Sequence, residues 1–411
     1  MSDYKPKPML AVRAALDFLL HAARPVAQME SVPTLAANGR VLALAQTSGM
    51  NVPARDNTQM DGYAVRAADC VDSAGVGARL PVSQRIPAGH VGQPLQPGTA
   101  ARIFTGGLIP EGADAVVMQE QCALVDGVVS VRHAPAPGEW IRRAGEDITD
   151  GGLILAAGTR LRSQELGLAA SVGLAELPVW RKLRVAVFFT GDELTMPGQP
   201  LAPGAIYNSN RFTLRALLEN LGCDISDYGI VPDALDATRA VLRAAAGAHD
   251  LIITSGGVSV GEEDHIKPAV EAEGRLDMWQ IAVKPGKPLA FGTVQDAFFI
   301  GLPGNPVSSF ITFLIFVRPF ILRMQGVADA AALAPKAYTL RADFSWPKAD
   351  RRNEFLRARI NDQGGLDLFA NQGSGVLTST VWGDGVIDNP PGQTIAPGDS
   401  VRFIPFSELL H

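Results

Sequence analysis

The alternation of short apolar runs with helical segments between Leu183 and Arg323 is the feature that most restricts the fold of this chain. Each apolar run is long enough for a buried strand and too short for a helix. Strands that alternate with helices form βαβ units and a largely parallel sheet. Ligands bind beyond the carboxyl ends of the strands in such sheets. The sequence therefore predicts an α/β domain with a site at that edge.

The individual elements of this region follow from the same pattern. The expected strands are 183–189, 225–231, one starting at Leu251, one near 278–283, and 298–300. The expected helices are 209–221, 235–246 and a long apolar helix that ends at Arg323.

The stretch Leu251–Lys267 carries the strongest local signal for a ligand site. Its strand ends in Ser255-Gly256-Gly257, where two residues without a Cβ let backbone N–H groups approach a ligand. Ser259 and Glu262 have capping-box spacing, so we expect a helix to start near Val260. A strand, a glycine loop and a helix N-terminus together form an anion site. Glu262 and its acidic neighbours Glu263 and Asp264 would repel bare phosphate but would tolerate phosphate that carries a divalent metal.

Three carboxylates, Glu193, Asp233 and Asp264, each follow a separate predicted strand at this edge. Convergent carboxylates repel one another unless a hard cation neutralises them, and Mg²⁺ commonly bridges carboxylates and phosphate oxygens. The alternative is that loops at a sheet edge collect acidic residues without binding anything. Residues 256–261 nearly match a P-loop, but Glu262 stands where the lysine must be, which disfavours Walker-type nucleotide hydrolysis.

Two further loops could contribute to this site. Lys284-Pro-Gly-Lys287 places two cations on a stiff loop suited to an oxyanion, although a surface turn with solvated lysines explains the pattern equally well. Residues 301–306 form a rigid turn before the apolar helix, with Asn305 as its expected cap, and this turn could be purely structural.

The rest of the chain indicates separate β-rich units. Residues 51–146 contain short β-like runs among Gly and Pro, with turn chemistry at Asp61-Gly62, and residues 328–411 read as a small all-β domain. Residues 1–50 and 147–180 form an N-terminal helix and an elongated linker unit, with a second helix capped by Ser163. The predicted fold class is α/β plus β: a central three-layer α/β/α domain over 181–327, an inserted β-domain and a C-terminal β-barrel-like domain.

Composition narrows the function classes. A net charge of −6 over 411 residues without Lys/Arg blocks argues against nucleic-acid and anionic-membrane partners. The N-terminal apolar segment is interrupted by Arg13 and Asp17 and reads as an amphipathic helix rather than a signal peptide. Three widely spaced cysteines without ligand spacing argue against a disulfide framework or structural zinc. We expect a cytoplasmic protein.

Five motifs resemble those of the molybdopterin molybdenumtransferases, the MoeA family that includes the gephyrin E domain. They are D-N-T-Q-M-D-G-Y-A-V-R, T-G-D-E-L, S-G-G-V-S-V-G-E-E-D, K-P-G-K-P and L-P-G-N-P-V-S, in family order, with G-E-D and G-S-G-V-L between and after them. The resemblance implies insertion of molybdate into adenylylated molybdopterin with Mg²⁺-dependent release of AMP. It also implies a homodimer whose cleft combines the inserted β-domain of one subunit with the α/β domain of the other. The adenylyltransferase and apo-molybdoenzymes are further partners that it suggests.

The resemblance assigns functional positions residue by residue. The catalytic set that it implies is Asp61, Thr105, Asp147, Glu193, Asp233 and Asp264, with Glu193 and Asp264 as metal ligands. The expected substrate-binding set, with the glycine loop included, is Ser255, Gly256, Gly257, Lys287, Pro288, Pro303, Asn305, Pro306, Ser308, Arg352 and Ser374. The chain departs from the family pattern at Arg55, where an aromatic residue is common.

Two alternatives from other classes remain at this point. One is a scaffold, since gephyrin relatives anchor receptors. The other is the related adenylyltransferase step, which shares the α/β module but does not need both β-domains.

Overall fold

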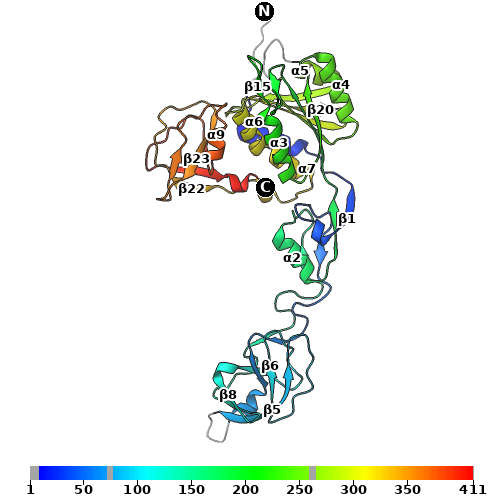
Figure 1. Cartoon of the computed structure of the whole chain (residues 1–411), viewed down its shortest axis with the longest axis vertical. Coiled ribbons are helices and arrows are strands. Elements are labelled where there is room, and N and C mark those ends of the chain that lie inside the picture. Colours follow the sequence, from blue (N-terminus) through cyan, green and yellow to red (C-terminus); the bar gives the residue numbers. More distant parts are fainter. Residues whose placement is uncertain (1–8, 72–76, 259–264, 411) are drawn as a thin grey trace, which may run out of the picture.

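The computed structural model describes residues 9–71, 77–258 and 265–410, and Figure 1 shows an elongated molecule. The α/β domain and the C-terminal β-domain lie at one end, and the inserted β-domain lies at the other. A slender linker that carries β1 and α2 joins the two ends. Residues far apart in this shape cannot form one site within a single chain.

The α/β domain is built on a six-stranded sheet. The order of its strands is β16 (Asp224–Val231), β13 (Arg184–Thr190), β17 (Leu251–Ser255), β21 (Ala297–Leu302), β20 (Pro288–Val294) and β18 (Gly274–Gln280). The first four strands are parallel, and the last two are antiparallel additions. Strands β17 and β21 are buried along their whole length, because helices cover both faces of a parallel sheet.

Helices cover both faces of this sheet, which gives three layers. On β13, Val185 and Val187 face one hydrophobic core, while Ala186 and Phe188 face the other. The first core takes helices α1 (Val12–Ala22), α3 (Ser209–Asn220), α6 (Pro306–Thr312) and α7 (Arg318–Met324). The second core takes α4 (Leu235–Ala246) and α5 (Ile266–Glu273). The three-layer α/β/α prediction is correct.

The long apolar helix is the centre of the first core. It runs over Pro306–Met324, with a π-helical turn at Phe313–Val317 between α6 and α7. By length and composition it could cross a membrane, but 94% of its most apolar window is buried inside the protein, so it is a core helix.

Most element predictions in this domain are confirmed, and the exceptions have physical causes. Helix α4 has the expected limits, whereas β20 was missed because a strand that begins at Lys287-Pro288 reads as a loop. The strand expected near 278–283 is divided: β19 (Val283–Lys284) leaves the sheet and pairs with the C-terminal domain. The helix start expected near Val260 lies outside the described residues.

The C-terminal domain is a sheet in the order β19, β23 (Asn353–Ile360), β25 (Gly385–Asn389), β26 (Ser400–Pro405) and β22 (Tyr338–Arg341). Strand β24 (Leu366–Leu368) pairs with β23, and helix α9 (Thr378–Trp382) follows it. Since β19 belongs to the chain of the α/β domain, the two domains share one hydrogen-bonded sheet edge.

The inserted domain is a second six-stranded sheet. Its order is β7 (Ala115–Met118), β4 (Gly62–Val65), β6 (Ala100–Ile103), β5 (Ala78–Ile86), β9 (Val128–Val131) and β8 (Cys122–Val125). Gly62 was expected in a turn, but it begins the inner strand β4. A Cβ at this position would lie 2.0 Å from the carbonyl oxygen of Val117 on β7, so close strand approach is the reason for the glycine.

Short antiparallel pairs build the linker. They are β2 (Gln46–Thr47) with β11 (Leu153–Leu155), and β1 (Met29–Pro33) with β12 (Glu176–Trp180). A further short pair, β3 (Asn57–Thr58) with β10 (Ile141–Arg142), belongs to the inserted domain. Helix α2 (Ser163–Ser171) packs beside the linker pairs, and its N-cap is Arg162, not the expected Ser163. The Glu165 carboxylate accepts the backbone N–H of Arg162 at 2.9 Å, which moves the cap back by one residue. We retain the four-part division of the chain drawn from the sequence as a proposal.

Candidate active site

The carboxyl edge of the parallel sheet gathers acidic side chains from neighbouring strands. Glu193 follows β13 and is exposed, while Asp233 follows β16 and is half-buried. Asp192, which the sequence reading did not single out, joins these loops because its Oδ1 accepts the Asp233 backbone N–H at 3.3 Å. Among the described residues no group of three or more His, Cys, Asp or Glu side chains is arranged to hold a metal. Asp264, the other expected metal ligand, lies outside the described residues.

A buried amide joins the two glycine-containing loops of this edge. Asn210, 9% exposed, donates through Nδ2 to Ser255 Oγ at 2.8 Å and to the Gly304 carbonyl at 2.7 Å. Ser255 Oγ in turn donates to the Pro303 carbonyl at 2.9 Å. The structure thus brings the expected residues Ser255 and Pro303 together through a residue that sequence reasoning missed. The available signal was the polar run 208–210 at the start of a helix on the ligand side of the sheet.

The Ser255-Gly256-Gly257 loop has no room for side chains. A Cβ on Gly256 would lie 2.4 Å from the Thr190 carbonyl oxygen, and one on Gly257 would lie 2.7 Å from Thr190 Oγ1. Both glycines have positive φ angles. Within the described chain, Thr190 Oγ1 and Asn208 Nδ2 are buried without a hydrogen-bond partner. Unpaired buried polar groups are rare in proteins, so this edge has hydrogen-bonding capacity available for a ligand.

Replacing Asn210 with alanine is expected to weaken substrate binding about tenfold, since the buried Ser255 hydroxyl and the Gly304 carbonyl each lose a donor. The stability cost is about 2 kcal/mol for the same reason. Substrate titration and urea denaturation measure the two effects. Asn220→Ala, at the far end of the same helix, is the matched control. Unchanged substrate affinity in Asn210→Ala would contradict the role of the amide.

The turn before the long helix is hydrogen-bonded to the C-terminal domain. The Val307 backbone N–H at the start of α6 donates to the Ser374 carbonyl of the C-terminal domain at 3.0 Å, next to the buried Ser308. Pro306 is the first residue of α6, and Asn305 occupies the N-cap position. The expected capping bond is absent, because the Asn305 side chain accepts no backbone N–H.

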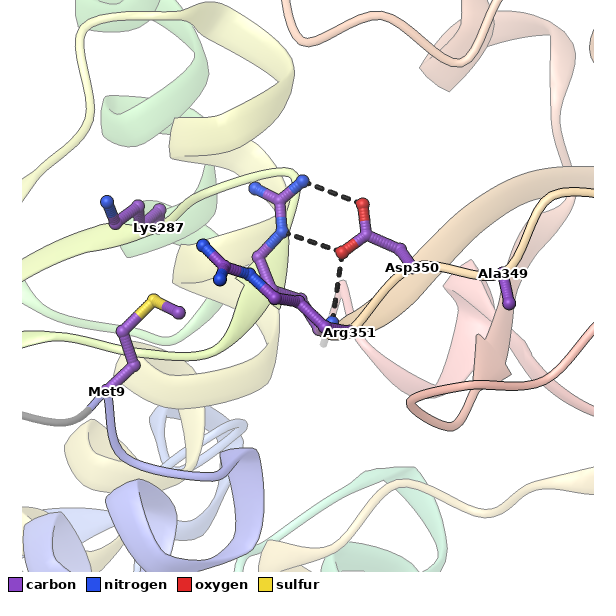
Figure 2. Close-up of a pocket in the computed structure, with 6 residues that line it drawn as sticks. Met9, Lys287, Ala349, Asp350 and Arg351 are labelled. Atoms are coloured by element: carbon purple, nitrogen blue, oxygen red, sulfur yellow. Dashed lines mark hydrogen bonds and ion pairs between the residues drawn. The ribbon is translucent and has the colours of Figure 1, made fainter.

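A basic cavity of about 510 Å³ lies where the C-terminal domain meets the α/β domain (Figure 2). Its lining includes the two cations expected from the sequence, Lys287 and Arg352, in addition to Met9, Ala349, Asp350 and Arg351. Pro288 follows Lys287 as the first residue of β20.

The cations around this cavity differ in their partners. Arg352 donates to both oxygens of Asp350, at 2.8 and 3.0 Å, and these bonds hold the pKa of Asp350 well below its usual range. Lys284 lies 2.9 Å from the buried Glu354 carboxylate and 3.4 Å from Asp350. Lys284 is therefore paired with acidic groups rather than solvated, and the hypothesis that both lysines of this loop serve an oxyanion stays a prediction.

Asp61 and Thr105 form a pair in the inserted domain. Asp61 Oδ1 accepts the Thr105 backbone N–H at 2.8 Å and its hydroxyl at 2.7 Å. These bonds lower the pKa of Asp61, so the group is a carboxylate acceptor at neutral pH. Asp147 is exposed where the inserted domain rejoins the linker, and its N–H donates to the Val52 carbonyl. This domain lies at the opposite end of the molecule from the sheet edge (Figure 1), so one chain does not unite the expected catalytic residues.

Comparison with known proteins agrees with this arrangement. Three family models match in order: the MoeA N-terminal region (domain I and II) over residues 10–173, the "Probable molybdopterin binding domain" over 186–323, and the MoeA C-terminal region (domain IV) over 339–406.

Two curated relatives and one solved structure show how far the likeness extends. The molybdopterin molybdenumtransferase of Haemophilus influenzae is 41% identical over 93% of this chain and 95% of its own. The protein of that name from Nostoc is 39% identical over 98% and 95%. A crystal structure of the molybdopterin biosynthesis moeA protein from Pyrococcus horikoshii covers 97% of this chain and 100% of its own, with 28% identity and a TM-score of 0.83. The chain therefore belongs to the MoeA family of molybdopterin molybdenumtransferases.

Proposed function

We propose that this chain is a transferase that inserts molybdate into adenylylated molybdopterin and releases AMP, giving active molybdenum cofactor. The observation that carries the proposal is the cavity at the domain junction, which both Lys287 and Arg352 line. Molybdate is a tetrahedral dianion, and Lys and Arg bind such oxyanions through charge-assisted hydrogen bonds. The two curated relatives are named for this activity, and the match to each extends over nearly its whole length.

The substrate has an anionic pyrophosphate that suits the Ser255-Gly256-Gly257 loop. Backbone N–H groups and the free polar atoms Thr190 Oγ1 and Asn208 Nδ2 supply donors for it. Water then cleaves the pyrophosphate bond and AMP leaves. The dithiolene sulfurs bond to molybdenum in place of molybdate oxygen, which leaves as water with the thiol protons. The loops orient the reacting phosphate, and the cavity holds molybdate near it.

Mg²⁺ fits the donor set at the sheet edge. Glu193 offers a hard oxygen ligand, which Mg²⁺ prefers, and Asp192 and Asp233 lie in the neighbouring loops. The described residues do not bring three carboxylates together, but one or two suffice because Mg²⁺ keeps several waters. We propose Glu193 and Asp264 as direct ligands. The ion would supply neutralisation of the pyrophosphate charge.

Replacing Glu193 with glutamine is expected to raise the Mg²⁺ concentration for half-maximal AMP release about tenfold, since one anionic ligand is lost. Mg²⁺ titration of AMP release measures the effect. Glu219→Gln, an exposed change on the far end of α3, is the control. A Glu193→Gln enzyme with the wild-type Mg²⁺ requirement would remove Glu193 from the metal site.

We propose a homodimer in which Asp61 and Thr105 of one subunit complete the cleft of the other. The support is the shape of the chain, which keeps this pair far from its own sheet edge (Figure 1). Mixing Asp61→Asn subunits with Glu193→Gln subunits tests the arrangement, because an intact site forms only in a mixed pair. Activity that stays at the level of the separate variants would count against it.

One assay separates this function from its alternatives. The protein is incubated with adenylylated molybdopterin, Mg²⁺ and molybdate, and AMP release and activation of an apo-molybdoenzyme are followed. Formation of adenylylated molybdopterin from ATP would instead support the adenylyltransferase step. If the protein catalysed neither reaction, the scaffold alternative would be favoured.

We propose a cytoplasmic location, which the free cysteines Cys70, Cys122 and Cys223 support. We also propose the adenylyltransferase and apo-molybdoenzymes as protein partners.

A further inference from the structure

Arg351 is a third cation of the basic cavity, and its state differs from that of Arg352. Arg352 is held by both oxygens of Asp350, and Lys284 outside the cavity is held by Glu354 and Asp350. Arg351 and Lys287 have no carboxylate partner in the described part of the chain. Both side chains are exposed, and both line the cavity whose residues Figure 2 draws.

The electrostatics of the lining favour a doubly charged ligand. Three cations and one carboxylate line the cavity, and the lowered pKa of Asp350 keeps that carboxylate ionised. Two positive charges are therefore left over. Like charges that converge without a counterion are stabilised by an anion, and a dianion balances them completely.

The chemistry of the two free cations is complementary. The Lys287 ammonium is a compact point charge, whereas the Arg351 guanidinium can present two parallel N–H groups to two oxygens of one tetrahedral ion. A cavity of about 510 Å³ has room for the ion together with waters. Met9 and Ala349 contribute apolar surface to the lining, which reduces competition of water for the hydrogen bonds to the ion.

We propose that Arg351 is a direct ligand of the oxyanion, acting with Lys287, while Asp350 keeps Arg352 oriented and partly neutralised. The identity of the oxyanion as molybdate rests on the proposed function. The Arg351 assignment itself rests on the cavity and on the unpaired charge. Arg351 lies outside the sequence motifs that carry the family resemblance.

The test compares Arg351→Ala, Arg351→Lys and Lys348→Ala. Lys348 is an exposed cation three residues from Arg351, and it does not line the cavity. Lys348→Ala therefore changes the net charge by the same amount as Arg351→Ala without changing the cavity. Molybdate alone is titrated into each protein at low ionic strength, with all proteins at the same concentration, and binding is measured by calorimetry. We expect about tenfold weaker binding for Arg351→Ala, about threefold for Arg351→Lys, and less than twofold for Lys348→Ala.

Turnover separates this inference from the proposed function. AMP release is measured against molybdate concentration, and Arg351→Ala should raise KM for molybdate with kcat kept, because saturating ion restores occupancy. Equal molybdate affinity in Arg351→Ala and wild type, or an equal loss in Lys348→Ala, would overturn the inference. A wild-type protein that binds molybdate through Arg351 but releases no AMP would overturn the proposed function and leave the Arg351 assignment standing.

Discussion

Replacing Glu354 with alanine is expected to lower the free energy of unfolding by about 2 kcal/mol, because it removes a buried acceptor that three side chains share. Glu354 is 1% exposed and accepts from Lys284 at 2.9 Å, from Trp346 Nε1 at 2.9 Å and from Asn389 at 3.2 Å. All three donors would lose this acceptor, while Lys284 keeps Asp350 and Asn389 keeps the Gln393 carbonyl. Lys284 lies on β19, the strand by which the α/β domain joins the C-terminal sheet, so docking of the two domains weakens with it.

Urea denaturation followed by tryptophan fluorescence measures this loss. The oxyanion cavity lies at the same junction, so KM for molybdate should also rise. Glu354→Gln keeps an oxygen acceptor and should be milder than alanine. Asp367→Ala removes an exposed pair with Arg359 and a hydrogen bond from Asn361, and it should cost about 1 kcal/mol. Equal stability of Glu354→Ala and Asp367→Ala would show that the buried pair does not hold the junction.

Replacing Gly62 with alanine is expected to destabilise the inserted domain by about 3 kcal/mol and to reduce kcat about a hundredfold. The added Cβ would lie 2.0 Å from the Val117 carbonyl oxygen and 3.2 Å from Met118 Cα. Since these are backbone atoms of the adjacent strand, β4 itself must move. Asp61 precedes Gly62 directly, so its hydrogen bonds to Thr105 are displaced with the strand.

Thermal unfolding and AMP release test this prediction together. Gly49→Ala is the control, because a Cβ at that glycine meets no atom within 4 Å and the φ angle is not positive. Normal kcat in Gly62→Ala would mean that β4 tolerates the displacement or that Asp61 is not needed for turnover.

The sequence predicts the α/β architecture well because parallel strands covered on both faces appear as continuous apolar runs. Strands β17 and β21 are of this kind, and their residues are buried throughout. Strand β20 does not give that signal at its start, where Lys287 and Pro288 indicate a loop. Its strand character depends on pairing with β21 and β18, which are tertiary contacts.

The site residues also fall into two groups, those that lie in local motifs and those that tertiary contacts place in the site. The placement of Ser255 at the sheet edge and of Lys287 on the cavity could be predicted because each lies in a local loop motif, while their roles in binding stay predictions. Asn210 could not be predicted, because its role depends on how α3 lies against two loops that are distant in the sequence. Arg351 could not be predicted, because an exposed arginine acquires a site only when the C-terminal domain docks beside Lys287. Local chemistry can be read from a chain, whereas contacts created by docking require the folded structure.

The buried helix Pro306–Met324 has a consequence for the synthesis of the protein. Phe310, near its start, packs edge-on against Phe406, with ring centroids 5.5 Å apart. Phe406 lies in the C-terminal domain, which follows this helix in the chain and is therefore synthesised after it. Until then one face of a helix apolar enough for a lipid bilayer remains uncovered. Nascent chains that stall within the last domain thus display a hydrophobic surface that chaperones and proteases recognise, whereas complete chains conceal it.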